Sequence, residues 1–74
     1  MPAIIRPIGS LKSYIAEKPE VEIESGITVR EAILQLGIPP EIVALVIVND
    51  TDQNKDYLIQ DKDVVKLLAI IGGG

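Results

Sequence analysis

One short helix gives the strongest local signal in this sequence. Thr28 is followed three residues later by Glu31, which is the spacing of a capping box. In such a box the Thr hydroxyl accepts from the Glu backbone N–H, and the Glu carboxylate accepts from the Thr backbone N–H. Gly37 is a natural left-handed helix stop, and Pro39-Pro40 prevents continuation. The sequence therefore predicts a helix over residues 29–36. Its apolar residues form one stripe at helical spacing: Val29, Ala32, Ile33 and Leu36.

The rest of the chain is predicted to be mainly extended. Residues 21–24 alternate apolar and charged side chains, as a half-buried strand does. Residues 42–48 are apolar throughout and rich in β-branched side chains, which indicates a strand covered on both faces. Ser10 is expected to cap a short helical turn that runs to Ala16. The remaining predictions are a strand over residues 3–8, a loop over 49–56, a short strand or turn over 57–59, a turn over 61–63 and a last strand over 64–71.

A single amphipathic helix among short strands restricts the fold of a chain of 74 residues. Such a chain buries its helix by packing it across one sheet. The order strand, strand, helix, strand, short strand, strand corresponds to an α+β fold of the β-grasp (ubiquitin-like) type, with a single mixed sheet packed on one main helix. We expect one β-grasp domain over residues 1–71 and a flexible C-terminal glycine tail over residues 72–74.

Two absent residue types exclude several kinds of chemistry. The sequence contains no Cys and no His. Thiolate catalysis, a Ser-His relay, zinc ligation by Cys or His and iron–sulfur binding are therefore excluded. If the protein handles sulfur, no side chain can hold that sulfur as a persulfide. The sulfur would have to be carried by the chain terminus.

Charge and hydropathy argue against two kinds of partner. The net charge is -4 and the seven basic residues are scattered, which disfavours binding to nucleic acid. No apolar run approaches the ~20 residues needed to cross a bilayer, so no membrane contact is expected. The N-terminus lacks a charged segment followed by a long apolar stretch, so we expect no signal peptide and a cytoplasmic protein.

A calcium loop is a rival interpretation of one polar segment. Asp50, Asp52, Asn54 and Asp56 are spaced like the first ligands of such a loop. Lys55, however, occupies the position that requires Gly, and the flanking segments are predicted strands rather than helices. A solvated hairpin loop is the preferred interpretation, and we predict no metal site.

The last third of the chain resembles a known family. Residues 59–65, Ile-Gln-Asp-Lys-Asp-Val-Val, are similar to the Leu-x-Asp-Gly-Asp-x-Val turn before the last strand of the MoaD/ThiS family. These are the small sulfur carriers of molybdopterin and thiamine-thiazole synthesis. The spacing from Asp63 to Gly74 matches that family without a gap. Further similarities cover essentially the whole chain: Thr28-Val29-Arg30-Glu31, Gly37-Ile38-Pro39, Val46-Ile47-Val48-Asn49 and residues 6–15.

Three features of the sequence depart from the family pattern. Lys62 stands where the family usually has Gly, and because a Lys in a left-handed turn is strained, we expect this turn to be built differently. Gly72 stands where Ala is common, which gives three terminal glycines. Ala69-Ile70 occupies the place of the Pro-Pro pair that is common in molybdopterin carriers.

The resemblance implies that the C-terminal carboxylate is the working group. An adenylating enzyme of the MoeB/ThiF type, which uses ATP and its own metal, would adenylate Gly74. A sulfur donor would then convert the adenylate to a thiocarboxylate that donates sulfur in cofactor biosynthesis. Gly73 belongs to the same site, because a tail without Cβ atoms can thread a narrow channel.

The resemblance also implies the partners of the chain. The chain would be a carrier and co-substrate rather than an enzyme, with no bound cofactor, as in the small, non-catalytic subunit of a synthase such as molybdopterin synthase. The sulfur would pass to a large synthase subunit or to a thiazole synthase. The overall length and residues 38–49 favour molybdopterin, and the missing Pro-Pro pair keeps the thiazole of thiamine as the next candidate.

The alternation of the last strand predicts a docking surface. Only one of its faces can meet the single helix, and Leu67 belongs to that face. Leu68 and Ile70 belong to the other face, next to the glycine tail. We therefore expect them to contact a partner, together with Ile71 and Gly72.

Two other functions are compatible with this sequence. One is a non-covalent β-grasp interaction module, which the free Gly-Gly end disfavours. The other is a ubiquitin-like protein modifier that is joined to lysines through Gly74. A modifier and a sulfur carrier need the same adenylate, so the sequence does not separate them.

Overall fold

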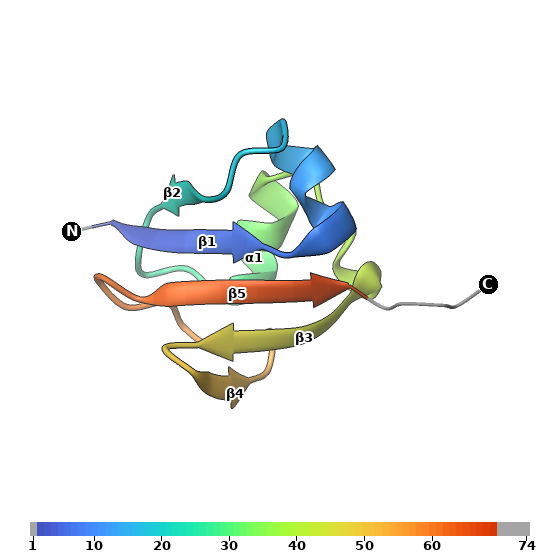
Figure 1. Ribbon diagram of the computed structural model, residues 1–74. Coiled ribbons are helices and arrows are strands. Elements are labelled where there is room, and N and C mark those ends of the chain that lie inside the picture. The colour runs from blue at the N-terminus through green and yellow to red at the C-terminus, as the bar shows by residue number, and fades with distance from the viewer. Residues whose placement is uncertain (1, 70–74) are drawn as a thin grey trace.

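The computed structural model of the protein describes residues 2–69, and the description below is confined to them. The chain order of its elements is shown in Figure 1. They are the strand β1 (Ala3–Pro7), the 3₁₀ helix η1 (Gly9–Ile15), β2 (Val21–Ile23), the α-helix α1 (Val29–Gln35), the 3₁₀ helix η2 (Pro40–Ile42), β3 (Val43–Val48), β4 (Thr51–Gln53) and β5 (Val64–Ala69).

The strands form one mixed sheet. Within the described residues it has five strands in the order β2-β1-β5-β3-β4. β1 and β5 pair in parallel, and the other neighbours are antiparallel. In Figure 1, α1 lies against one face of this sheet. The predicted mixed sheet on one main helix is therefore confirmed, and β5, the last strand in the chain, lies at its centre.

The capping box forms as predicted and fixes the start of α1. The Glu31 backbone N–H donates to Thr28 Oγ1 over 3.1 Å, and the Thr28 N–H donates to Glu31 Oε1 over 2.9 Å. The bond from the Thr28 N–H lowers the pKa of the Glu31 carboxyl, because it favours the charged form. Gly37 follows the helix with a φ of 78°, the left-handed conformation that glycine adopts without strain.

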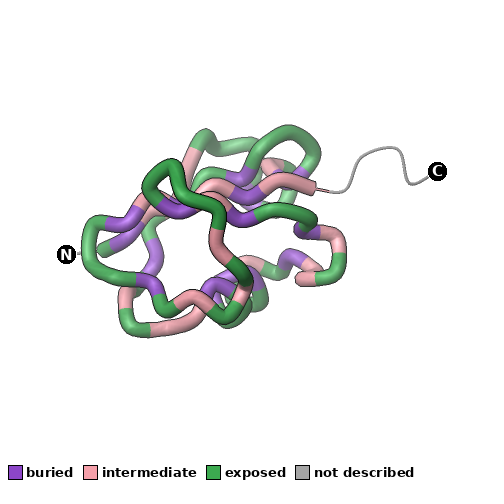
Figure 2. The backbone as a smooth tube through the Cα atoms, turned by 90° about the horizontal axis from the view of Figure 1, so that it is seen from below, coloured by how far each residue is buried: buried purple, intermediate pink, exposed green. Residues whose placement is uncertain are grey.

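The hydrophobic core lies between α1 and the sheet. It contains aliphatic side chains from the sheet, from α1 and from the segments between them, and Figure 2 shows buried positions interspersed with intermediate and exposed ones along the chain. The core residues are Ala3, Ile5, Leu11, Ile23, Val29, Ala32, Ile33, Ile38, Val43, Val46, Val48, Ile59, Val65 and Leu67.

The start of η1 differs from the prediction. Ile8 is its N-cap and makes no side-chain cap bond, whereas Ser10 lies inside the helix and its carbonyl accepts from the Ser13 hydroxyl over 3.0 Å. The prediction that Ser10 caps the turn was wrong. Gly9, at a φ of 65°, lets the chain turn directly from β1 into the helix, so no polar cap is used.

The segment after β3 also differs from the prediction. Residues 49–56 were expected to form a loop, but Thr51–Gln53 is the edge strand β4. Asn49 and Asp50 form a two-residue turn with φ values of 50° and 68°, which is the positive-φ pattern of tight hairpins. At residues 57–59, where a short strand or turn was expected, the structure has one isolated bridge between Leu58 and Thr28.

The prediction that β3 is covered on both faces was wrong. Val43, Val46 and Val48 are buried, but Ala44 and Leu45 are both exposed. The pairing with β5 shifts register between Val43 and Leu45, as a β-bulge does. Because of the bulge, buried and exposed positions do not strictly alternate along β3.

A buried carboxylate holds the start of β5. Asp63 is 5% exposed and accepts three hydrogen bonds: from Asn49 Nδ2 over 2.7 Å, and from the Tyr57 hydroxyl and the Gln60 N–H over 2.8 Å each. Asn49 Oδ1 in turn accepts from the Val64 N–H over 3.0 Å. Burial acts to raise the pKa of the Asp63 carboxyl, but the three hydrogen bonds outweigh it and lower the pKa below its ordinary value.

Replacing Asp63 tests this network. Asp63→Asn should lower the free energy of unfolding by about 1–3 kcal/mol at neutral pH, because an amide cannot satisfy all three buried donors. The folded-state pKa is depressed, so the stabilisation by Asp63 is fully present above the unfolded pKa of about 3.9 and is lost as the pH falls through the folded pKa.

Denaturant unfolding of the wild type and the variant over a series of pH values measures this difference. The difference should be constant above about pH 5 and shrink in acid. Asp52→Asn, at an exposed position, is the control and should change stability by less than about 0.5 kcal/mol at all pH values. An Asp63→Asn deficit that stays the same in acid would contradict this account.

Contrary to the expectation from the sequence, the turn at Lys62 is not built differently from the family pattern, because Lys62 itself adopts the left-handed conformation. Its φ is 68°, and the turn closes with the Asp63 N–H donating to the Gln60 carbonyl over 3.2 Å. A left-handed conformation costs an L-residue roughly 1–2 kcal/mol relative to glycine. Lys62→Gly should therefore stabilise the protein by about 1 kcal/mol in thermal or denaturant unfolding. Lys62→Ala removes the same charge but keeps the Cβ, so it should not stabilise.

Candidate functional site

The predicted reactive tail follows the central strand of the sheet. β5 is flanked by β1 and β3, and its last residue, Ala69, is the register partner of Val43. Gly73 and Gly74 lie outside the described residues. The same is true of three of the predicted partner contacts, Ile70, Ile71 and Gly72.

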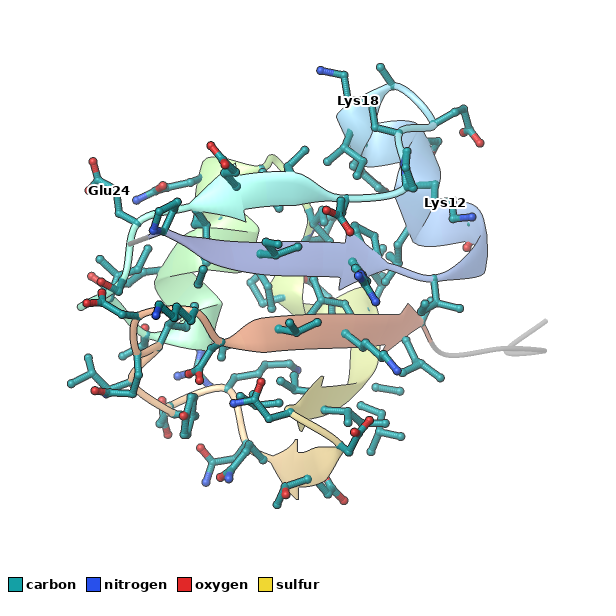
Figure 3. The ribbon with its side chains drawn as sticks, turned by 60° about the vertical axis from the view of Figure 1, so that its left-hand side comes forward. Lys12, Lys18 and Glu24 are labelled. Carbon is teal, nitrogen blue, oxygen red and sulfur yellow. The ribbon has the colours of Figure 1, made fainter. Side chains whose placement is uncertain are left out.

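Leu68 is the predicted contact residue that the structure does describe. Val65 and Leu67 on β5 are 0% exposed and face the core, whereas Val64, Lys66 and Leu68 are only half-buried. Figure 3 shows the face of the sheet turned away from α1, which we call the open face, and no described helix or strand lies over it. The predicted division of β5 into a core side and an outer side is confirmed.

Leu68 belongs to a row of apolar side chains formed by β3, β5 and the residue that follows β1. Leu45 on β3 is its register partner, and the Ile8 N–H donates to the Leu67 carbonyl over 2.9 Å, which places Ile8 beside Leu68 on the β1 side. Ile8 is 42% exposed and Leu45 is 37% exposed. Ile8, Leu68 and Leu45, which we call the apolar row, lie at the end of β5 from which residues 70–74 continue.

Sequence reasoning missed two members of the apolar row. Ile8 was assigned to the first strand without a face, and Leu45 was placed in a strand thought to be covered on both sides. Their exposure depends on the β1–β5 register and on the bulge near Ala44. The sequence contained one indirect signal for Ile8 alone: Gly9, which follows it directly, marks the end of the first strand.

The acidic side chains of residues 50–56 diverge instead of converging on a metal. Asp50 lies 3.8 Å from Lys66 Nζ, and Asp56 forms an ion pair with Arg30. Asp52, on β4, is the register partner of Ile47 on β3. Among residues 2–69, no three Asp, Glu, His or Cys side chains are grouped as metal ligands. The hairpin therefore offers no basis for a calcium site.

The aspartates of the last turn stabilise structure. The Ser25 hydroxyl donates to Asp61, and this bond lowers the pKa of the Asp61 carboxyl. Asp63 is saturated by the donors described above, so it is not available as an acid or base. These contacts agree with the prediction that both are turn residues rather than catalysts.

The described part of the chain has no helix with the length and hydropathy needed to cross a membrane.

Comparison with known proteins identifies a family and several structural neighbours. The model described as the ThiS family matches residues 8–74. The structure is similar to that of Urm1 from Trypanosoma brucei, with a TM-score of 0.73, 18% identity, and coverage of 99% of this chain and 95% of that one. It is also similar to a putative molybdopterin converting factor subunit 1 from Pyrococcus furiosus, with a TM-score of 0.70, 18% identity and coverage of 96% and 99%.

A third similar structure is a complex of subunits 1 and 2 of the molybdopterin-converting factor from Helicobacter pylori. Its TM-score is 0.59, with 26% identity and coverage of 100% of both chains. No curated protein sequence matches this chain. The structural similarities confirm the predicted β-grasp fold.

Proposed function

Because this chain belongs to the ThiS family of ubiquitin-like sulfur carriers, we propose that its working group is the C-terminal carboxylate of Gly74. A carboxylate oxygen attacks the α-phosphorus of ATP and displaces pyrophosphate, which leaves an acyl-adenylate. The sulfur of a donor then attacks the carbonyl carbon, and the bond to AMP breaks. With a persulfide donor the product is an acyl disulfide; a second thiol then attacks the donor's own sulfur, the S–S bond breaks, the donor leaves as a disulfide, and the thiocarboxylate remains.

The extent of the family match is the observation that carries this proposal. The match runs through Gly74, so it includes the glycine tail as well as the folded part. The absence of Cys from the sequence supports the same conclusion, because no side chain can hold a persulfide. The carrier is a co-substrate rather than an enzyme, and ATP and its metal are bound by the activating partner.

The division of the chain follows from this chemistry. Residues 1–71 form the domain that the partner recognises, and residues 72–74 form the tail that reaches the reaction centre. Gly73 and Gly74 have no Cβ atoms, so the activating enzyme can close around the reacting carbon from several sides. Ordering the tail costs conformational entropy, which docking of the domain offsets.

The apolar row is the proposed docking surface. Leu68 is its central member, and Ile70, Ile71 and Gly72 extend the contact toward the reactive end. An adenylating enzyme of the MoeB/ThiF type binds there first. A large synthase subunit or a thiazole synthase binds there afterwards and takes the sulfur.

The recipient of the sulfur is proposed to be molybdopterin synthesis, with thiamine-thiazole synthesis as the next candidate. The overall length and residues 38–49 support molybdopterin. The 26% identical neighbour from Helicobacter pylori, solved as a complex of subunits 1 and 2, supports docking on a larger synthase subunit. All of these reactions are proposed to take place in the cytoplasm.

Removal of the last residue tests the proposed chemistry. The chain lacking Gly74 and the variant Gly73→Val should both fail to form an adenylate or a thiocarboxylate with the activating enzyme, ATP and the sulfur donor. Intact-mass measurement detects the replacement of oxygen by sulfur in the wild type. Both variants should keep the wild-type melting temperature, since these residues lie beyond β5. Normal thiocarboxylate formation without Gly74 would overturn the proposal.

Substitutions on the two faces of β5 test the docking surface. Leu68→Asp should raise the dissociation constant for the activating enzyme about tenfold or more, because a charge disrupts an apolar contact at its centre. Leu67→Asp should instead unfold the domain, because an unpaired charge would be buried in the core at a cost of several kcal/mol. Calorimetric binding and thermal unfolding separate the two effects.

A leucine elsewhere provides the matched control. Leu34 is 57% exposed on α1, away from the open face. Leu34→Asp should bind the enzyme like the wild type. If Leu68→Asp unfolds the protein as Leu67→Asp does, Leu68 is part of the core and the assigned surface is wrong.

A further inference from the structure

The open face carries two cations side by side at its centre. Arg6 on β1 and Lys66 on β5 are register partners on neighbouring parallel strands, and Ile47 on β3 is the next residue in the same row. Two positive charges held next to each other repel.

The acidic partners of both cations lie at the rim of the face. Arg6 Nε is 2.9 Å from Glu20 Oε1, and Lys66 Nζ is 3.8 Å from Asp50 Oδ1. The Asp50 side chain is 90% exposed, and the other three side chains are 38–45% exposed. Exposed ion pairs of this kind contribute little to stability, because water screens the charges and ordering the side chains costs entropy. Both cations can therefore turn toward an incoming carboxylate at small cost.

Apolar side chains lie on two sides of the cation pair, while its row across the sheet ends in acidic residues, Glu20 beside Arg6 and Asp52 beside Ile47. The apolar row lies on the side toward the C-terminus, and Ile4 and Val64 are register partners on the other side. A shallow depression of about 320 Å³ opens beside the cations and is lined by both of them together with Asn49, Asp50 and Val64. A protein that covers the apolar row also covers Arg6 and Lys66, and it removes water from them. Charge interactions strengthen when water is removed, so one well-placed carboxylate would gain from both cations.

The distribution of other charges agrees with an acidic partner surface. In Figure 3, Lys12 and Lys18 lie at the end of the molecule toward which β1 and β5 run, whereas Glu24 lies at the opposite end. The chain as a whole carries a net charge of -4. Cations thus gather at the end of the open face that carries the apolar row, whereas Glu22, the register partner of Ile4, lies toward the opposite end.

We propose that Arg6 and Lys66 together bind a single Asp or Glu side chain of the protein that docks on the open face. This inference rests on the proposed function, because the docking protein is taken to be the activating enzyme. That enzyme would present a carboxylate in the middle of an apolar surface. The cation pair then fixes the orientation of the carrier, while the apolar row supplies contact area next to the tail.

The test measures the dissociation constant between the carrier and the activating enzyme for Arg6→Gln and Lys66→Gln, singly and together. Each single substitution should weaken binding about tenfold, mainly through faster dissociation. The double variant should depart from the product of the two single effects by about threefold or more, because both cations contact one carboxylate. Melting temperatures should stay near that of the wild type.

Matched controls remove one arginine or one lysine charge at positions away from the open face. Arg30→Gln breaks an exposed ion pair on α1, and Lys62→Gln removes a cation from the turn before β5. Both should bind within about twofold of the wild type. If they weaken binding as much as Arg6→Gln and Lys66→Gln do, the effect is one of net charge and the proposal is wrong.

Two further readouts separate the possible failures. If the wild type forms thiocarboxylate with the enzyme but the Arg6 and Lys66 variants react with an unchanged KM, the cation pair has no role and the proposed function stands. If the wild type forms no adenylate at all, the proposed function itself fails. If inorganic phosphate or a DNA duplex shifts the NMR signals of Arg6 and Lys66 while the activating enzyme does not, the cations bind phosphate groups and the proposal is wrong.

Discussion

The hydrogen bonds accepted by the Asp63 carboxylate fix the place where the last strand begins. They connect Asp63, the residue before β5, to the hairpin turn at Asn49, the loop at Tyr57 and the turn at Gln60. Asn49 also accepts from the N–H of Val64, the first residue of β5. β5 then runs between β1 and β3 through the middle of the sheet. The faces of β5, its register with both neighbours and the position from which the C-terminal residues continue all depend on that starting point.

The parts of the fold that rest on local interactions could be predicted from the sequence. The capping box of Thr28 and Glu31 and the glycine at position 37 define α1 within a few neighbouring residues, so no knowledge of distant contacts was needed. The strand β4 could not be predicted in the same way. Its residues are polar, and they are extended because a two-residue turn brings them back along β3.

In the candidate site, too, the residues placed by a local pattern could be predicted and those placed by strand pairing could not. The outward position of Leu68 followed from simple alternation, because β5 contains no bulge. Ile8 and Leu45 join Leu68 only through the registers of three strands and through the bulge of β3, and pairing registers are not encoded in any single segment. The pairing of Arg6 with Lys66 across two strands that are sixty positions apart in the sequence is non-local for the same reason.

The parallel pairing of β1 with β5 has a consequence for how the protein is made. Among the described strands β5 is the last to be synthesised, yet it lies between β1 and β3, so the sheet cannot form before β5 is available. A contact between the first and last strands closes nearly the whole chain into one loop, which makes folding late and cooperative. A prematurely terminated chain that lacks β5 therefore presents no folded surface to any partner.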